Sequence, residues 1–374
     1  MRVLLDATPL LLPGGGVKSY VYSLLLHLRR IGGGRAEVRA FPFVRECRKL
    51  AHEGSVFRPA STYARLGLVC LANGLRLPLM DLLGRDFDLF HETNTHVLYP
   101  PSNTRLTATI HDMTCWLMPQ VHQRANVIAT KRFFKRMRLR VDRWIAVSAR
   151  TRDDAAEAAG IPIERIEVIH PGVPDAFFKV VPGSVAAVRR KYGLFKPYVL
   201  NVGVLEPRKN VGALLTAYKH LPDQIRRDFD LVIAGPIGWG GHPELKRIHE
   251  GIAGVRYIGY VPEASLPALT SGATIFAYPS LYEGFGLPVA QAMAAGVPVV
   301  TSNTSALPET TGGAALAADP TNPDELAWAL ERLLSSDSLR KELAESGFRR
   351  AAEEYRWQKS AAKTLDFFAR VCNG

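Results

Sequence analysis

The stretch Glu283-Gly284-Phe285-Gly286 combines residue types that can hold an anion beside a carboxylate. An apolar run over 273–277 precedes it and predicts a buried strand, and residues 288–295 predict a helix that follows. Glycine lets backbone approach a ligand closely. The first turn of a helix offers free N–H groups and the positive end of the helix dipole. The stretch therefore predicts an anion site next to an acid, with phosphate as the common occupant.

Two adjacent cations, Arg208 and Lys209, follow the end of another predicted strand, and Gly203 comes directly after that strand. Arginine presents a planar fork to phosphate oxygens, and lysine adds a compact charge. A solvated charge pair is the plainer interpretation. Ligands of α/β sheets, however, bind at the carboxyl ends of strands. We therefore interpret the pair as a phosphate site that works together with Glu283.

The first half of the chain also carries polar features at predicted strand ends. A glycine loop, 14–16, opens a helix that contains Lys18 and Tyr20, and His111-Asp112 follows a later strand. A glycine loop at a helix start suits an anion, although a plain glycine turn is the alternative. A His-Asp pair is more often structural than catalytic, but its position at a strand end favours a site here.

Short apolar strands alternate with longer helical stretches in both halves of the sequence. This pattern is typical of parallel sheets covered on both faces, and 374 residues are enough for two domains. The sequence predicts an α/β protein of two Rossmann-like doubly wound domains. We place them at 1–178 and 179–355, with a last helix, 356–374, crossing back to the first domain. The predicted strands are 3–5, 38–43, 88–91, 106–110, 144–147 and 166–169, then 198–202, 231–234, 255–258, 274–277, 297–301 and 314–317.

Composition restricts the class of protein further. No apolar run approaches the 18 or so residues of a spanning helix, and the start of the chain lacks the apolar region of a signal peptide. The four cysteines show no paired spacing, which fits a reduced cytoplasmic setting and indicates neither a zinc site nor a disulfide framework. Residues 1–180 hold 26 Lys and Arg against 16 Asp and Glu, whereas residues 181–374 hold 21 against 19. The basic excess in the first half predicts an anionic partner there.

The segment 124–152 concentrates this charge, with ten basic residues and a single acid, Asp142. On a helix, Phe133, Met137 and Val141 form an apolar stripe. Arg132, Arg136 and Arg140 form the neighbouring basic stripe. A basic amphipathic helix is typical of a membrane-surface element. The alternative is that the apolar stripe packs on the sheet and the basic stripe is solvated, and the two interpretations are partly compatible.

Taken together, these motifs resemble the retaining GT-B glycosyltransferases of family GT4, and their bacterial mannosyltransferase branch in particular. The resemblance covers nearly the whole chain. It rests on the glycine loop, His111-Asp112, Arg208-Lys209-Asn210, Ala234-Gly235-Pro236 and the Glu283 stretch. It implies a hexosyltransferase that needs no metal and no cofactor. The donor would be a nucleotide diphosphate sugar, GDP-mannose favoured, bound between the domains. The acceptor would be a glycan, or a polyprenyl-diphosphate-linked glycan, in cell-surface polysaccharide synthesis.

The resemblance also implies roles for individual residues. His111, Glu283, Arg208 and Lys209 would be catalytic. In one departure, Gln291 stands where the family pattern has a ribose-binding glutamate; an amide can still hydrogen-bond a ribose hydroxyl. The implied donor diphosphate contacts are Arg208, Lys209, Gly15, Gly16, Gly286 and Leu287; the sugar contacts are His111, Glu283, Gly284, Phe285 and Gly286; the nucleotide contacts are Gly203 and Gln291; and the acceptor-side residues are Lys18, Tyr20 and Asp112.

Two other classes of function deserve comparison. A nucleic-acid-binding protein would explain the basic first half, but no aromatic platform or reading helix accompanies the charge. A sugar-nucleotide isomerase, or epimerase, on the same fold needs acids and histidines that converge on the sugar, and only Glu283 and His111 are offered. We therefore expect a glycosyltransferase that binds no nucleic acid, is cytoplasmic, and lies peripherally on the inner face of the membrane.

Overall fold

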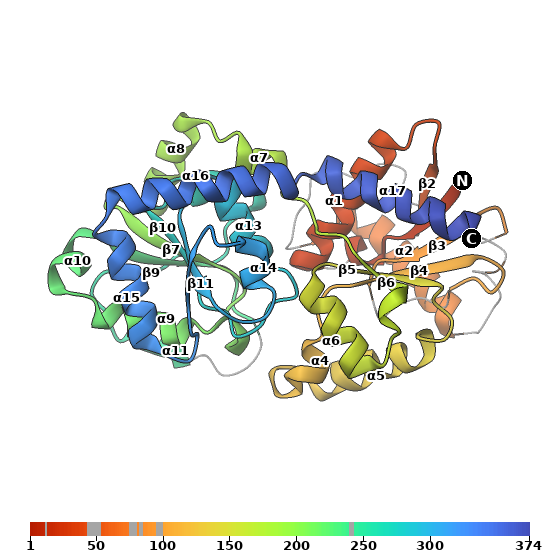
Figure 1. Ribbon diagram of the computed structural model, residues 1–374, viewed down its shortest axis with the longest axis horizontal. Coiled ribbons are helices and arrows are strands. Elements are labelled where there is room, and N and C mark those ends of the chain that lie inside the picture. The colour runs from red at the N-terminus through yellow and green to blue at the C-terminus, as the bar shows by residue number, and fades with distance from the viewer. Residues whose placement is uncertain (12, 43–53, 75–80, 82–84, 95–99, 239–242) are drawn as a thin grey trace. The chain divides into compact units, whose positions relative to one another are not determined.

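The computed structural model describes residues 1–11, 13–42, 54–74, 81, 85–94, 100–238 and 243–374 (Figure 1). The chain forms two compact units: Met1–Gly172 together with Trp357–Gly374, and Val173–Arg356. The first boundary lies before the predicted residue 178. Val173 N donates to Tyr355 O at 2.7 Å, which ties the chain after Gly172 to the second unit. The final helix packs in the first unit.

The first unit is built on a six-stranded sheet in which every neighbouring pair is parallel. Its order, β2-β1-β3-β4-β5-β6, places the first strand inside the sheet. The carboxyl ends of the strands share one edge because the strands are parallel. The strands are β1 (Arg2–Asp6), β2 (Glu37–Phe41), β3 (Leu89–Glu92), β4 (Arg105–Ile110), β5 (Arg143–Ala146) and β6 (Ile166–Val168).

Successive side chains along a strand point to opposite faces of the sheet, so the core of this unit has two layers. Val3 and Leu5 belong to a cluster with α1 (Gly16–Ile31) and α17 (Trp357–Asn373). Leu4 belongs to the opposite cluster, which includes residues of α5 (Arg124–Met137) and α6 (Ala149–Ala159). In Figure 1, α17 at the blue end of the chain lies beside α1 in red. The last helix thus completes the first unit's core.

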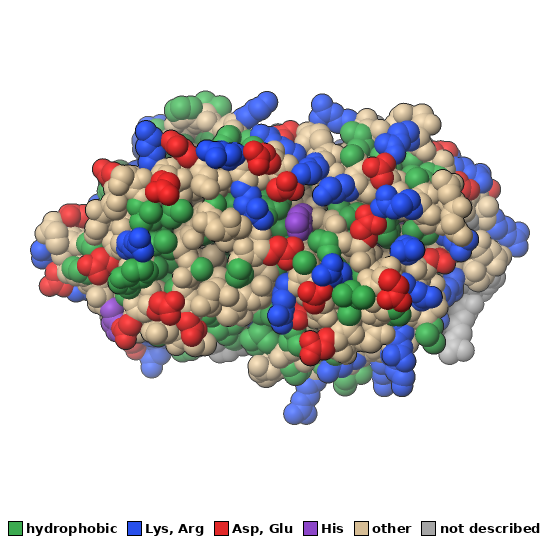
Figure 2. All heavy atoms as spheres, in the orientation of Figure 1, with side chains coloured by type: hydrophobic (Ala, Val, Ile, Leu, Met, Phe, Trp, Pro, Cys, Tyr) green, Lys and Arg blue, Asp and Glu red, His purple; other side chains and the backbone are tan. Residues whose placement is uncertain are grey.

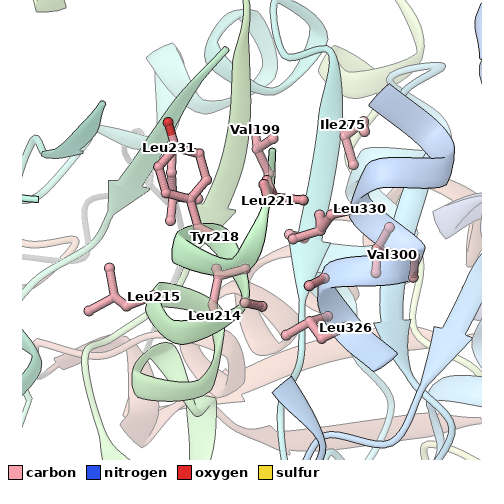
Figure 3. Close-up of a cluster of buried hydrophobic side chains, with 14 of the residues drawn as sticks. Val199, Leu214, Leu215, Tyr218, Leu221, Leu231, Ile275, Val300, Leu326 and Leu330 are labelled. Carbon is pink, nitrogen blue, oxygen red and sulfur yellow. The ribbon is translucent and has the colours of Figure 1, made fainter. Parts of the chain in front are cut away.

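The second unit contains a second parallel six-stranded sheet, in the order β12-β11-β10-β7-β8-β9. One face is covered by α9 (Val211–His220) and α15 (Pro323–Leu334), whose buried side chains pack on Val199, Ile275 and Val300 (Figure 3). The strands are β7 (Tyr198–Val202), β8 (Asp230–Ala234), β9 (Val255–Tyr257), β10 (Ile275–Tyr278), β11 (Val299–Ser302) and β12 (Leu316–Ala318).

Local sequence sets several helix ends. Ser148 accepts from Thr151 N at 3.0 Å and caps α6, while Asn322 caps α15 ahead of Pro323. The other α-helices are α2 (Pro59–Gly74), α4 (Thr114–Leu117), α7 (Asp175–Phe178), α8 (Pro182–Tyr192), α10 (Asp223–Asp228), α11 (Pro243–His249), α12 (Leu266–Ser271), α13 (Leu287–Ala294), α14 (Leu307–Thr311) and α16 (Asp337–Glu354). The 3-10 helices are η1 (Thr8–Leu11), η2 (Pro119–Val121), η3 (Ile163–Arg165), η4 (Pro207–Lys209) and η5 (Glu263–Ser265).

The two-domain α/β architecture predicted from the sequence is confirmed, and each of the twelve predicted strands overlaps a strand of the structure. The bounds differ by one or two residues at several ends. For example, β11 begins at Val299, after the predicted 297, because Gly296 with φ +69 makes the turn that precedes it. The strand predicted over 38–43 ends at Phe41, and residue 43 lies outside the described residues.

Candidate active site

The cations predicted to bind phosphate stand directly after β7, in the short helix η4. Asn210 ends that helix with φ +57, a left-handed conformation that is uncommon for a residue other than glycine. Its side-chain amide donates to Pro279 O at 3.1 Å and to Pro320 O at 2.7 Å. Asn210 therefore fixes the segment that holds Arg208 and Lys209 against two neighbouring loops.

The second segment, from β10 to α13, carries Glu283 and is shaped by Gly286. This glycine has φ +93, and a Cβ added to it would lie 2.5 Å from Leu307 Cδ2. Both facts restrict the position to glycine. Ser305, another non-glycine residue at φ +57, accepts from Glu283 N at 3.0 Å. The backbone around the carboxylate is thus fixed by loops after β10 and β11.

The carboxylate of Glu283 is held through one oxygen by donors from both segments. Oε1 accepts from Lys209 Nζ at 2.6 Å and Ser280 Oγ at 2.7 Å. It lies 3.0 Å from Arg208 Nη1, and Tyr278 Oη donates to it at 3.1 Å. Among the described residues, the hydrogen bonds and ion pairs of this carboxylate all end on Oε1, and none reaches Oε2. The arrangement fixes the carboxylate and leaves its second oxygen to accept a hydrogen bond from a ligand.

The charges in this cluster shift the pKa values of its members. Burial alone would raise the pKa of Glu283, but Arg208, Lys209 and the hydrogen bonds hold it at about 2. Burial lowers the pKa of Lys209, and the Glu283 charge opposes that change. Burial, followed by the Glu283 charge, raises the pKa of Tyr278 well above its ordinary value. Glu283 is therefore ionised at neutral pH and is a weak base.

Arg208 is engaged more fully than the sequence indicates. Its Nη1 donates to Tyr282 O at 2.7 Å, and its Nη2 donates to Glu206 Oε1 at 2.7 Å. With the contact to Glu283, the guanidinium lies between two carboxylates. Both predicted cations therefore contact Glu283 directly.

The other residues predicted on this segment play different structural parts. Phe285 is buried, with its ring 5.1 Å from that of Tyr355 in an edge-on arrangement, so its side chain belongs to the core. Leu287 begins α13, and Gln291 lies partly exposed on the same helix. Gly203 donates its N–H to Ala234 O at 2.9 Å at the end of β7. The predicted ligand contacts of these residues stay predictions. They concern Gly203, Gly284, Phe285, Leu287 and Gln291.

In the first unit, His111 stands at the end of β4. Its Nε2 lies 2.8 Å from Thr93 O, so this nitrogen carries the proton and Nδ1 is the acceptor in the neutral ring. Burial lowers the pKa of His111, while the hydrogen bond to the Thr93 backbone and the negative charge of Asp112 act in the opposite direction. The ring meets that of Tyr20 edge-on at 4.9 Å. The imidazole is therefore neutral at physiological pH and oriented from two sides.

The acceptor-side and glycine-loop residues also lie in this unit. Tyr20 and Lys18 are buried; burial raises the pKa of Tyr20 to about 12, and Lys18 Nζ donates to Gly54 O. Gly15 and Gly16 precede and begin α1, with open space where a Cβ would be. The buried side chain of Tyr20 packs against His111. The roles predicted for Tyr20, Lys18, Asp112 and the two glycines stay predictions.

Sequence reasoning missed several members of this site. The predicted residues Arg208, Lys209 and Glu283 are held by five side chains that the sequence did not single out. These are Glu206, Asn210, Tyr278, Ser280 and Ser305. The available signal was the sequence Glu206-Pro207-Arg208-Lys209, in which an acid stands two positions before the arginine that it binds. Tyr278 gives no such signal, since an aromatic residue at the end of a buried strand is usually core.

A second polar chain was also missed in the first unit. Thr114 Oγ1 donates to Asp112 Oδ1 at 2.5 Å and lies 2.7 Å from His122 Nε2. His122 lines a cavity of about 510 Å³ with Pro119, Gln120, Arg124, Val127 and Ile128. Asp112 is thereby linked to a partly basic, partly apolar hollow at the start of α5.

Within the described ranges, no cluster of three or more His, Cys, Asp or Glu side chains could hold a metal ion. None of the helices in those ranges is long and apolar enough to cross a membrane.

Known proteins share both halves of this arrangement. Residues 14–177 match the model of "Glycosyltransferase Family 4", and residues 186–350 match that of "Glycosyl transferases group 1". The chain is 32% identical to O-antigen chain mannosyltransferase B of Escherichia coli over 75% of this chain and 74% of that protein. It is 30% identical to the MMP alpha-(1->4)-mannosyltransferase of Mycolicibacterium hassiacum, over 63% of this chain and 56% of that protein.

Solved structures support the same assignment of fold. Anabaena HepE, crystallised with UDP and glucose, superposes with a TM-score of 0.72 at 18% identity, covering 99% of this chain and 100% of HepE. WaaG, a glycosyltransferase involved in lipopolysaccharide biosynthesis, gives 0.69 at 17% identity, covering 98% and 99%. Two Rossmann-like units and the Glu283 cluster define a GT-B glycosyltransferase. The chain belongs to glycosyltransferase family GT4.

Proposed function

We propose that the protein is a retaining, metal-independent mannosyltransferase. It transfers mannose from GDP-mannose to a glycan or a polyprenyl-diphosphate-linked glycan in cell-surface polysaccharide synthesis. The observation that carries the proposal is Glu283, fixed through Oε1 by Lys209 and three other donors beside the start of α13. The mannosyltransferase relatives favour mannose as the sugar. HepE, crystallised with UDP-glucose, provides the alternative donor that an experiment must compare.

The cluster can bind and orient such a donor through its own charges. Arg208 and Lys209 supply positive charge where the diphosphate gains negative charge as it leaves. Oε2 of Glu283 accepts a hydrogen bond from a hydroxyl of the donor sugar. The N–H groups at the start of α13, shaped by Gly286, add further donors for phosphate. These groups perform the electrostatic work that a metal ion performs in other transferases.

The low pKa of Glu283 bears on the route of the proton. A carboxylate with a pKa of about 2 is a poor general base near neutral pH. Its oxygen Oε1 is occupied by four donors, and we assign the second oxygen, Oε2, to a hydroxyl of the donor sugar. We therefore assign the acceptor's proton to an oxygen of the leaving diphosphate, with attack from the leaving-group face. The anomeric configuration of the donor is then retained.

The basic helix α5 favours a peripheral position on an anionic membrane. Of the predicted apolar stripe, Met137 and Val141 are buried and Phe133 is partly buried against the same core, as one of the two sequence interpretations expected, although α5 ends at Met137 and Val141 lies beyond it. Lysine and arginine side chains gather at the surface over α5 (Figure 2). They include Lys131, Arg132, Lys135, Arg136 and Arg138, which are exposed.

Two large apolar side chains stand in the same exposed surface. Ile128 is 51% exposed and Leu139 is 81% exposed. An exposed surface that combines cations and apolar side chains favours binding to anionic lipid headgroups. The cavity lined by His122 and Arg124 adjoins this surface and could take part of an anionic acceptor.

Donor identity is tested by incubating the protein with GDP-mannose or UDP-glucose and a lipid-linked glycan acceptor. The expected result is mannosyl transfer from GDP-mannose, an α-linked product by NMR, and full activity in EDTA. Transfer from UDP-glucose alone would assign a different donor. An inverted product would contradict the retaining mechanism. Turnover of a nucleotide sugar without acceptor, beyond slow hydrolysis, would instead favour the isomerase alternative.

Membrane binding is tested separately by flotation of vesicles with and without anionic lipid. The doubly reversed variant Arg132→Glu/Arg136→Glu should lose binding to anionic vesicles. The matched control, Arg227→Glu/Lys246→Glu, reverses two exposed cations of the second unit and should bind like the wild type. Wild-type binding that is equal on neutral and anionic vesicles would contradict the proposed surface.

A further inference from the structure

We propose that Thr93 is a positioning residue for His111. The carbonyl oxygen of Thr93 holds the imidazole in the tautomer whose Nδ1 accepts a hydrogen bond from a hydroxyl of the donor sugar. The hydroxyl of Thr93 fastens that carbonyl to the end of β1. The inference rests on the proposed function and goes beyond it, because the sequence singled out His111 for the sugar and gave Thr93 no part.

The contact between His111 and Thr93 decides which ring nitrogen carries the proton. Nε2 lies 2.8 Å from Thr93 O, and a carbonyl oxygen can only accept, so Nε2 is the donor. A neutral imidazole has one donor nitrogen and one acceptor nitrogen, which makes Nδ1 the acceptor. Among the described residues, no hydrogen bond reaches Nδ1, and the side chain of His111 is partly exposed. A ligand hydroxyl can therefore donate to Nδ1 without displacing Thr93.

The side chain of Thr93 fixes the position of the carbonyl that His111 needs. Thr93 follows β3 directly and is fully buried. Its Oγ1 donates to Asp6 O at 2.8 Å and lies 3.4 Å from Asp6 Oδ2. Asp6 ends β1, and its own carboxylate accepts from Thr8 N at 2.9 Å, which fixes the chain after the strand. The hydroxyl of Thr93 therefore ties the loop after β3 to a well-held strand end.

Three neighbouring strand ends meet through this one residue. β1, β3 and β4 are consecutive in the sheet, and their carboxyl ends share one edge because the strands are parallel. Asp6 ends β1, Thr93 follows β3 and His111 follows β4. Thr93 stands in the middle, with its hydroxyl bound to one neighbour and its carbonyl to the other. Removing the hydroxyl alone should loosen the carbonyl while leaving the sheet intact.

A buried polar network holds the aromatic neighbour of His111. The ring of Tyr20 meets the imidazole edge-on at 4.9 Å, and the Tyr20 hydroxyl is hydrogen-bonded to Thr109. Thr109 Oγ1 lies 3.0 Å from Nε2 of His91, and the Nδ1 of His91 lies 2.9 Å from Thr107 Oγ1. Burial lowers the pKa of His91 to about 3, so this second imidazole stays neutral. The packing orients the His111 ring, whereas the bond to Thr93 selects its tautomer.

Thr93→Val tests the anchor, because it removes the hydroxyl and keeps the shape of the side chain. The kcat for transfer from GDP-mannose should fall at least tenfold. Calorimetric affinity for bare GDP should stay within twofold of wild type, since GDP lacks the sugar that His111 contacts. Thr93→Ser restores the hydroxyl and should recover most of kcat. Thr364→Val is the matched control, which removes a buried hydroxyl of the same unit that donates to Ser360 O at 2.9 Å, and it should change neither quantity.

The tautomer is read directly, without substrate, by NMR of protein labelled with 15N-histidine. His111→Gln removes the His111 signals and so assigns them. Wild type at neutral pH should show a proton on Nε2 and none on Nδ1, and Thr93→Val should show both tautomers. A threonine that only stabilises its loop would leave the tautomer unchanged, so an unchanged spectrum in Thr93→Val would overturn the positioning role. If that variant does not fold, a proton on Nδ1 in the wild type would overturn it equally.

Monodeoxy analogues of GDP-mannose, each lacking one sugar hydroxyl, test the partner of Nδ1. One analogue should lose at least fivefold in kcat/KM with wild type and lose nothing further with Thr93→Val. The same additional loss in Thr93→Val on every analogue would overturn the hydrogen bond to a donor hydroxyl. Failure of the proposed function gives a different result, in which wild type transfers no sugar from GDP-mannose, and the NMR measurement then still decides whether Thr93 sets the tautomer of His111.

Discussion

Lys209 Nζ lies 2.6 Å from Glu283 Oε1, although 74 positions separate the two residues in the sequence. The contact joins the loop after β7 to the loop after β10, and these two strands are neighbours in the sheet. Parallel pairing brings their carboxyl ends to the same edge. The fold therefore assembles, from two distant segments, the ion pair on which the proposed chemistry depends.

Acid should weaken the second unit through Glu283. The pKa of this carboxyl is about 2 in the folded protein against an ordinary value of 4.5, so its ionised form stabilises the fold above pH 4.5 and that stabilisation is lost as the pH falls toward 2. The shift corresponds to about 3 kcal/mol. Urea unfolding at pH 6, 4 and 3 should show the free-energy advantage of wild type over Glu283→Gln shrinking with acidity. An advantage that stays constant over this range would contradict the ion-pair cluster.

Asp6 should act in the opposite sense in the first unit. Burial raises its pKa to about 6 from an ordinary value of 3.8, so the stabilisation that it contributes is complete below pH 3.8 and is lost as the pH rises through 6. Asn mimics the protonated acid and can still accept from Thr8 N, which lies 2.9 Å from Asp6 Oδ1. At pH 8, the free energy of unfolding of Asp6→Asn, measured by urea titration, should therefore exceed that of wild type by about 3 kcal/mol. Near pH 4 the two free energies should be equal.

The control for that experiment is Asp86→Asn, which changes an exposed acid of the same unit. It should follow the wild-type profile at both pH values. If Asp6→Asn instead destabilises the protein at pH 8 as strongly as at pH 4, the carboxylate has a structural partner that needs its charge.

Gly286→Ala should damage both stability and donor binding. The substitution places a side chain at φ +93 and puts a Cβ 2.5 Å from Leu307 Cδ2. Gly296→Ala is the matched control, because that glycine has φ +69 but open space around a Cβ. The control should cost about 1–2 kcal/mol from backbone strain alone. Thermal unfolding should show a larger loss of stability for Gly286→Ala than for Gly296→Ala. Adding Leu307→Ala to Gly286→Ala should restore part of that stability. Equal losses in the two glycine variants would mean that the contact with Leu307 is easily relieved.

Gln291 should contribute a hydrogen bond, and not a charge, to nucleotide binding. Gln291→Leu removes both donor and acceptor, so binding of the preferred nucleotide diphosphate should weaken about fivefold, which corresponds to about 1 kcal/mol. Gln291→Glu restores the residue of the family pattern and should bind within about threefold of wild type. Calorimetric titration measures both. A strong loss in Gln291→Glu would instead show that the native amide is tuned to its ligand, and no loss in Gln291→Leu would remove the ribose contact.

The sequence alone determined the architecture and the position of the site along the chain. Buried strands such as 198–202 carry a two-sided apolar pattern that only a covered parallel sheet accommodates, so the strands and the domain type could be predicted locally. Gly286 was predictable in the same way, since its place between a strand and a helix requires a special backbone conformation.

Only the tertiary structure decided how the charges are shared. Lys209 has no local feature that names its partners Tyr278 and Glu283, because those contacts join loops that follow two neighbouring strands and lie 69 and 74 positions away along the chain. Pairing of β7 with β10 brings both predicted cations, Arg208 and Lys209, into direct contact with the carboxylate of Glu283. Sequence fixes which charges are present near a strand end, whereas burial and distance, set by the fold, decide which of them a ligand can reach.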